Sequence, residues 1–163
     1  MRPTPPKGHS PPRLAVVGGG LIVALMIAVA WETLERRQPS TMQLETPKGV
    51  VVVEVADTPD ARSAGLSNRE SLDAIDGLLL TWDAPGRHPI WMAEMRFPLD
   101  VAWIHSSGRV IAVLAGVPPC HKQPCPLYEP EETHDSIAVL ELRAGAAANH
   151  RIAAGTSFET LRR

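Results

Sequence analysis

The sequence predicts a mainly β domain with two short helices, folded as a small antiparallel β-barrel or a curled sheet. Short apolar and β-branched runs alternate with prolines and glycines, which is typical of strands separated by turns. Helix signals are confined to two short segments. In addition, residues 14–31 are uncharged and apolar, which predicts one hydrophobic helix before the domain.

The first elements of the domain follow from local signals. Residues 50–56 form a β-branched run, which predicts a strand. Thr58 is a suitable N-cap and Pro59 fits the first position of a helix, so we expect a short helix to begin there. That helix should end near Gly65.

The rest of the domain consists of further strands and one more helix. The Ser-Ser-Gly sequence at residues 106–108 predicts the turn of a β-hairpin, and residues 83–86 predict a separate turn. The alanine-rich residues 143–150 predict the second helix, because alanine has the highest helix propensity. The other strands are expected at residues 78–82, 90–95, 99–104, 109–117, 137–142 and 155–161.

One acidic residue, Asp100, lies within the most apolar stretch of the chain. A charge in a dry interior is costly unless it is paired or hydrogen-bonded. We therefore expect Asp100 to accept hydrogen bonds from backbone amides or from Arg62, and so to hold a helix against the sheet.

The same region also has a functional interpretation. Asp100, Arg62, Glu94 and Arg96 form a candidate cluster for a small polar ligand, with Trp91 as one wall. A sharper alternative makes Asp100 and Glu94 a pair of carboxylates for general acid–base hydrolysis. That alternative requires the two carboxyl groups to meet in one cleft.

The chain divides into four segments. Residues 1–13 are rich in proline and basic, which is typical of a disordered segment. Residues 14–31 would make a helix of about 27 Å, close to the hydrocarbon thickness of about 30 Å. Residues 32–48 are polar and are interpreted as a linker, and residues 49–162 as the globular domain.

The apolar segment from Leu14 to Trp31 has two interpretations. It is either a transmembrane anchor with Trp31 at the interface, or a signal peptide cleaved after Ala30. The sequence Ala28-Val29-Ala30 has the small-x-small form of a cleavage site. Both interpretations export the domain, because the basic flank of the segment favours the cytoplasmic side.

The charge and cysteine content limit the classes of partner. The net charge is −2, which gives no indication of nucleic-acid binding. The two cysteines, Cys120 and Cys125, are suited to a local disulfide in an oxidising compartment. A metal site with His121 or His134, or two free thiols, are the alternatives, and we predict no metal site.

Several short motifs keep a fixed order from residue 50 to residue 161. They are Thr58-Pro59 with Arg62 and Gly65-Leu66, Arg69-Glu70-Ser71-Leu72, Gly77-Leu78-Leu79, Trp91-Met92, Pro98-Leu99-Asp100, Gly108-Arg109-Val110, Pro119-Cys120, Cys125-Pro126-Leu127-Tyr128, and Leu140-Glu141-Leu142 with Ala144-Gly145. In these motifs the chain resembles the family known as domain of unknown function 192. The resemblance implies a compact β-rich domain that is often exported or membrane-tethered in bacteria, and it implies no activity.

One stretch departs from the family pattern. The usual Phe-Trp-Met-Lys-Asn-Thr is replaced here by Ile90-Trp91-Met92-Ala93-Glu94-Met95. If the replaced Lys and Asn positions contact a ligand shared by the family, this chain binds that ligand differently or not at all.

Together these observations predict an accessory or binding module of the bacterial envelope, without a cofactor. We expect it to be anchored in the inner membrane through residues 14–31, with its domain in the periplasm or outside, or to be secreted or periplasmic after cleavage. Its partner would be a polar small molecule, a glycan or an envelope protein. The alternative is an envelope hydrolase or transferase that uses Asp100 and Glu94.

Overall fold

The computed structural model describes residues 40–133 and 135–162. The predicted segments at residues 1–13 and 14–31 lie outside this part of the chain, so the N-terminal helix is not among the elements below. Among the helices that are described, none has the length and apolar character needed to cross a membrane.

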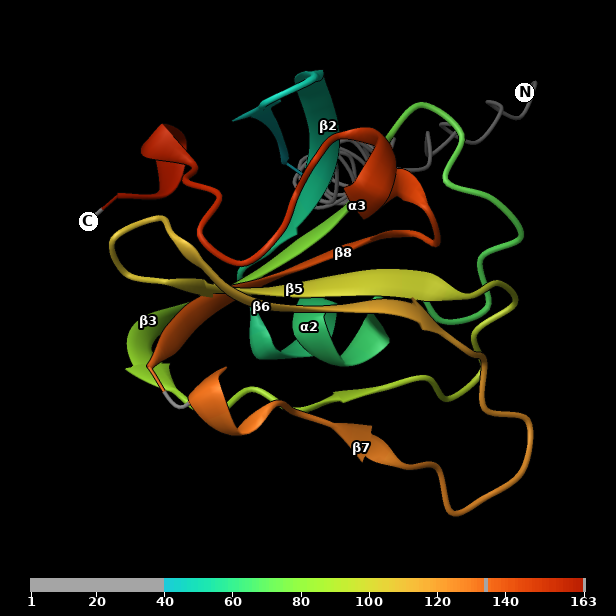
Figure 1. Cartoon of the computed structure of the whole chain (residues 1–163). Helices are drawn as coiled ribbons and strands as arrows, with labels where there is room; N and C mark the ends of the chain where they lie inside the picture. Colours follow the sequence, from blue (N-terminus) through green and yellow to red (C-terminus); the bar gives the residue numbers. More distant parts are fainter. Residues whose placement is uncertain (1–39, 134, 163) are drawn as a thin grey trace, which may run out of the picture. The chain divides into compact units, whose positions relative to one another are not determined.

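A six-stranded mixed sheet forms the centre of the domain, with the strand order β1-β2-β3-β8-β5-β6 (Figure 1). All neighbouring strands are antiparallel except β2 and β3, which are parallel and joined through helix α2 (Pro59–Ala64). The strands are β1 (Thr41–Thr46), β2 (Gly49–Ala56), β3 (Gly77–Gly86), β5 (Leu99–His105), β6 (Val110–Val117) and β8 (Ser136–Arg143).

The sheet is open, so the β-barrel alternative was wrong, whereas the mainly β class with two short helices is confirmed. Strands β1 and β6 lie at opposite ends of the strand order and do not pair with each other. A barrel buries its interior by closing the sheet on itself. Here separate elements cover each face of the sheet, and closure is not needed to bury the apolar side chains.

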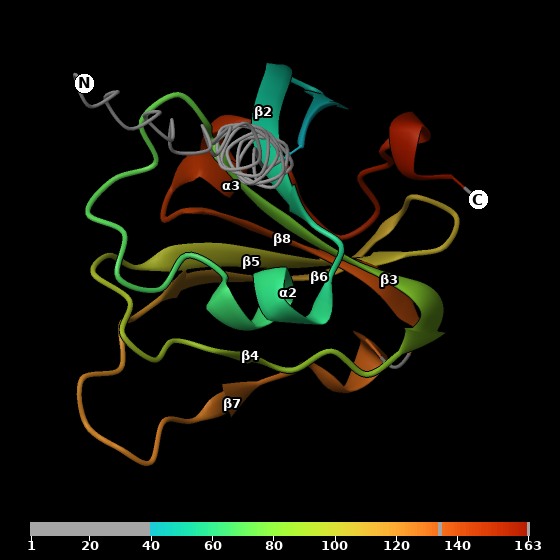
Figure 2. The ribbon, with the colours of Figure 1, turned by 180° about the vertical axis from the view of Figure 1, so that it is seen from behind.

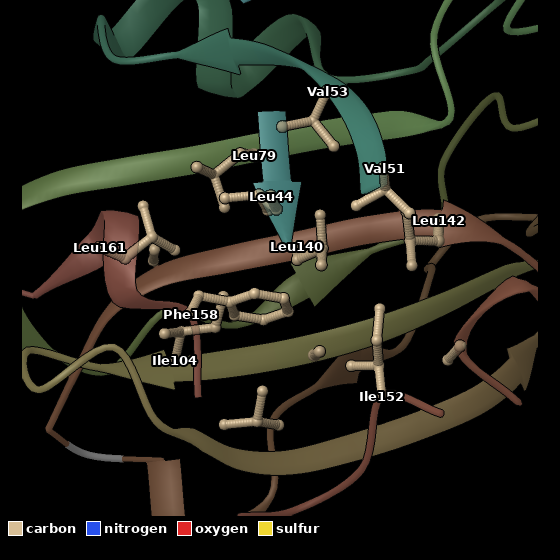
Figure 3. Packing of buried hydrophobic residues seen from close by; sticks show 14 of the residues in the cluster. Leu44, Val51, Val53, Leu79, Ile104, Leu140, Leu142, Ile152, Phe158 and Leu161 are labelled. Carbon is tan, nitrogen blue, oxygen red and sulfur yellow. The ribbon is translucent and has the colours of Figure 1, made fainter. Parts of the chain in front are cut away.

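One face of the sheet is covered by α3 (Ala146–Asn149) and the C-terminal segment that ends in the 3-10 helix η2 (Glu159–Leu161). Figure 3 shows Leu140, Leu79 and Phe158 gathered in this core. Phe158 is fully buried. Burial of a side chain of this size contributes about 1.5–3 kcal/mol, which helps to hold the C-terminal segment on the sheet.

The opposite face is covered by α2 and by a two-stranded ribbon of β4 (Ile90–Trp91) and β7 (Leu127–Tyr128), which lie on the same side of the sheet in Figures 1 and 2. A short 3-10 helix, η1 (Glu131–Thr133), follows β7. The second core lies beneath this cover and is built around the fully buried Trp103.

Helix α2 forms as its sequence predicts. The Thr58 side chain accepts a hydrogen bond from the amide of Ala61, and Pro59 occupies the first turn. Gly65 ends the helix with a positive φ of 51°. The hairpin of β5 and β6 is also confirmed. Its turn requires Gly108, where φ is 75° and a Cβ atom would clash with the carbonyl of Phe158.

Four predicted elements differ from the structure. Residues 41–46 form β1, in a segment assigned to the linker, and β3 continues through the predicted turn at residues 83–86. The expected strand at residues 90–95 is reduced to β4, because Met92 and Met95 turn into the core. Residues 155–161 make one bridge, between Arg109 and Ser157, before η2.

Candidate functional site

Asp100 is held by the backbone and is not open to a ligand. It is 2% exposed and points to the face covered by α3. Its Oδ1 accepts a hydrogen bond from Gly116 at 2.9 Å, and its Oδ2 accepts bonds from Gly145 at 2.8 Å and Ala147 at 3.0 Å. The expectation of backbone donors is therefore confirmed, and the helix that Asp100 holds against the sheet is α3.

Arg62 does not contact Asp100 and instead joins α2 to the sheet. Its Nη1 donates to the carbonyl of Asp57 at 2.7 Å and to that of Thr81 at 2.8 Å. The guanidinium also lies 5.1 Å from the centre of the Trp82 ring. Two carbonyls and an indole face thus fix the Arg62 side chain between α2 and β3.

The remaining members of the predicted cluster are dispersed. Arg96 pairs with Glu70 at 3.0 Å on the surface, and Glu94 accepts a hydrogen bond from Asn68 at 2.7 Å in the loop after β4. Because Glu94 lies on the side of the sheet covered by α2 and Asp100 faces α3, the two carboxyl groups do not share a cleft. The structure gives no support to a mechanism that uses this pair.

The predicted disulfide is present between Cys120 and Cys125. The Cys120 amide donates to the carbonyl of Met92 at 2.9 Å, which ties the disulfide loop to the segment after β4. The loop leads directly into β7, so it helps to fix the ribbon of β4 and β7. In residues 40–133 and 135–162, no group of His, Cys, Asp or Glu side chains is arranged to hold a metal ion.

A pocket of about 360 Å³ lies between α2, β3, β4 and β8, and we call it the α2 pocket. Trp91, which is 52% exposed, forms part of its wall. The lining residues are Pro59, Arg62, Ser63, Ala64, Gly65, Leu66, Ser67, Leu80, Trp82, Pro89, Ile90, Trp91, Met95 and Glu141. Two of the predicted ligand-binding candidates, Arg62 and Trp91, therefore meet in one cavity.

Glu141 is the residue that sequence reasoning missed. It lies in the middle of β8, is 5% exposed, and lines the α2 pocket. Among the described residues, no hydrogen bond reaches its carboxyl, and its oxygens face the pocket. Burial raises the pKa of Glu141 to about 7. The signal in the sequence is an acid inside the apolar run at residues 137–142, where it also forms part of the Leu140-Glu141-Leu142 motif.

An aromatic stack supports the wall of the pocket. The rings of Trp82 and His88 are 3.7 Å apart and nearly parallel, and Trp103 donates from its indole to the His88 carbonyl at 2.9 Å. Burial is the main cause that lowers the pKa of His88, and the positive charge of Arg62 adds to the effect. A neutral imidazole is well suited to stacking on an indole, so this wall is preformed.

Comparisons with solved structures identify the same fold in two bacterial proteins. One, from Sinorhizobium meliloti 1021, is provisionally described as a transcription regulator; it has a TM-score of 0.64 and 24% identity over 74% of this chain and 93% of its own. The other, a protein of unknown function from Novosphingobium aromaticivorans DSM 12444, has a TM-score of 0.62 and 24% identity over 74% of this chain and 84% of its own. At this identity the likeness shows the fold alone.

The sequence comparisons agree with the motifs. No curated protein matches the chain. A sequence model of DUF192, described as "Uncharacterized ACR", matches residues 35–160. That match includes every strand of the sheet and every residue of the α2 pocket. The chain therefore belongs to the domain of unknown function 192 family.

Proposed function

We propose that this domain is a binding module of the bacterial cell envelope that holds a small polar group in the α2 pocket. The bound group is either a free molecule or part of a glycan or envelope protein. The observation that carries the proposal is the carboxyl of Glu141, which is buried, lacks a hydrogen-bond partner in the described structure, and lines an open cavity. Its oxygens are not among the fully enclosed side-chain atoms that lack a partner, so they face the cavity and can accept hydrogen bonds from a ligand there.

The rest of the pocket supports binding of an amphipathic ligand. Ligand sites are commonly apolar cavities with a few polar groups that fix orientation. Leu80, Ile90 and Met95 supply the apolar lining, and the half-exposed indole of Trp91 offers a flat surface at the margin. Such a surface suits an aliphatic or sugar ring.

The geometry favours binding over hydrolysis. Glycoside hydrolysis by the common mechanisms requires two carboxyl groups, separated by about 5–10 Å. Glu141 is the only acidic residue among the described residues that line the α2 pocket. A single carboxyl with a raised pKa is sufficient to bind a ligand, so we place this domain among binding modules.

The first test blocks the α2 pocket. Ala64 is exposed and lines the pocket, so Ala64→Trp fills the cavity without disturbing the core. We expect saturation-transfer NMR with the purified full chain to detect binding of at least one member of a panel of monosaccharides, amino acids and alkyl amines. That signal should be lost in Ala64→Trp.

The matched control is Ala154→Trp, an equally exposed position on the C-terminal segment and outside the pocket lining. This variant should bind as the wild type does. Binding that survives in Ala64→Trp, or a panel in which no compound binds the wild-type chain, would contradict the proposed site.

The envelope location is the second part of the proposal. Two features support it: the uncharged segment at residues 14–31, preceded by basic residues, and the disulfide between Cys120 and Cys125. We propose that residues 14–31 anchor the chain in the inner membrane, with the domain in the periplasm. Cleavage after Ala30 is the alternative, and it would release the same domain.

Fusion reporters test this location. Alkaline phosphatase joined after residue 163 should be active in bacterial cells, and β-galactosidase joined at the same position should be inactive. The opposite pattern would refute export. Fractionation of the same cells separates the two outcomes at residues 14–31, because an uncleaved anchor leaves the phosphatase in the membrane fraction.

A further inference from the structure

We propose that the ligand of the α2 pocket carries an ammonium group, and that this cation lies against the carboxylate of Glu141. This inference rests on the proposed binding function and specifies its chemical class. The group bound would be a primary or secondary amine on a largely apolar frame.

Among the described residues, no neighbouring group compensates the charge of Glu141. On one side, Leu78 of β3 is its direct cross-strand neighbour, and on the other side Val101 of β5 is. Both are buried and apolar. A carboxylate in such surroundings is destabilised relative to the protonated form, which is why its pKa is high. A cation placed against it would restore the charged form.

The charged groups on the same face of the sheet already have other partners. Glu54, on β2, receives two hydrogen bonds of 2.8 Å from Arg69. Arg143, two residues along β8, lies 4.4 Å from the ring centre of Phe97. Arg62, on α2, is held by Asp57 and Thr81, and in the described structure it forms no ion pair with Glu141.

An added cation is therefore the missing partner, and the walls of the pocket favour one. The indole of Trp91 lines the cavity and is half exposed, whereas the ring of Trp82 already contacts His88 and Arg62. An open indole face such as that of Trp91 attracts cations, and attraction of opposite charges is stronger where water is excluded. Leu80 and Ile90 would contact the apolar frame of the ligand. A neutral alcohol gains from the same apolar walls but gives the carboxylate no opposite charge.

Benzylamine and benzyl alcohol make a matched pair of probes, since they share one frame and differ in the cation. Their dissociation constants are measured by isothermal titration calorimetry with the full chain in detergent micelles, after subtraction of a detergent titration. Benzylamine should bind more tightly than the alcohol at pH 8. With a pKa of about 7, Glu141 is about one-tenth ionised at pH 6 and nine-tenths ionised at pH 8, so amine affinity should rise about tenfold.

Glu141→Gln keeps the shape of the side chain and removes its charge. In this variant we expect benzylamine affinity to fall at least tenfold at pH 8 and to lose its pH dependence, while binding of benzyl alcohol is unchanged. Glu159→Gln, at an exposed position in η2, is the control and should bind both probes as the wild type does. Circular dichroism confirms that each variant is folded.

The outcomes separate this inference from the proposed function. Suppose that benzyl alcohol or a monosaccharide binds the wild type, that Ala64→Trp abolishes this binding, and that benzylamine binds no more tightly. The α2 pocket is then a binding site, and the assignment of an ammonium ligand is wrong. Amine binding that persists in Glu141→Gln would also overturn the assignment. If no probe binds in the α2 pocket, the proposed function fails as well.

Discussion

At the scale of single residues, two buried acids have opposite roles. Asp100 accepts three hydrogen bonds from backbone amides, which connect β5 to the end of β6 and to the start of α3. Glu141, on the neighbouring strand, lies on the other face of the sheet and has no hydrogen-bond partner in the described structure. The first acid stabilises the fold, whereas the second leaves a polar group available to a ligand.

Replacement of Asp100 should destabilise the domain. Asp100→Asn presents an amide nitrogen to at least one of the three backbone donors, so we expect a loss of about 2–4 kcal/mol in the free energy of unfolding. Urea denaturation of the full chain measures this loss. Asp83→Asn, at an exposed position in β3, should change stability by less than about 0.5 kcal/mol. Equal effects of the two substitutions would show that the Asp100 contacts contribute little.

The sequence predicted a buried, hydrogen-bonded Asp100, because an acidic side chain inside an apolar run is costly unless donors surround its carboxylate. It could not identify those donors, since Gly116, Gly145 and Ala147 reach the carboxyl only through strand pairing and the α3 turn. The same logic applies to Glu141. Its position in the chain was known, but whether it meets a donor or a cavity depends on how α2 packs.

At the scale of elements, structure encoded by neighbouring residues was predictable. Helix α2 has its cap and first-turn proline within three residues, and the hairpin of β5 and β6 has its turn between the strands. Elements that depend on distant partners were not. β1 is polar in sequence and becomes a strand through its pairing with β2. The sequence of residues 155–161 predicted a strand, but the Phe158 side chain is buried in the core and the segment makes one bridge before η2 begins.

At the scale of the whole molecule, the position of β8 could not be inferred from local patterns. It is the last strand in sequence and pairs with both β3 and β5. This placement fixes Glu141 in the middle of the sheet, below α2. The candidate site is therefore a product of topology, which explains why two of its residues were predicted and the buried acid was not.

The free energy of unfolding of the whole domain should depend on pH through the titration of Glu141. Its pKa is raised from 4.5 to about 7 on folding, so the folded state holds the proton more tightly than the unfolded state. The tighter proton binding adds about 3 kcal/mol to the free energy of unfolding, and this contribution is fully present below pH 4.5 and is lost as the pH rises through 7. Glu141→Gln removes it, so the stability of this variant relative to wild type should increase between pH 5 and pH 8.

Urea denaturation at both pH values provides the measurement, and the difference between the two chains cancels the titration of other groups. Glu159→Gln should show no such trend, because that residue is exposed. A constant difference between Glu141→Gln and wild type across this range would mean that the carboxyl is solvated or paired in solution.

The strand order also determines how the chain must assemble. Because β8 is inserted between β3 and β5, those two strands cannot join the final sheet until residues 136–143 have emerged from the ribosome or translocon. Until then, both carry open backbone edges of the kind that promote aggregation. A truncated chain that ends before residue 136 would lack β8, the strand that joins the two halves of the sheet, and the cell would have to protect or degrade it.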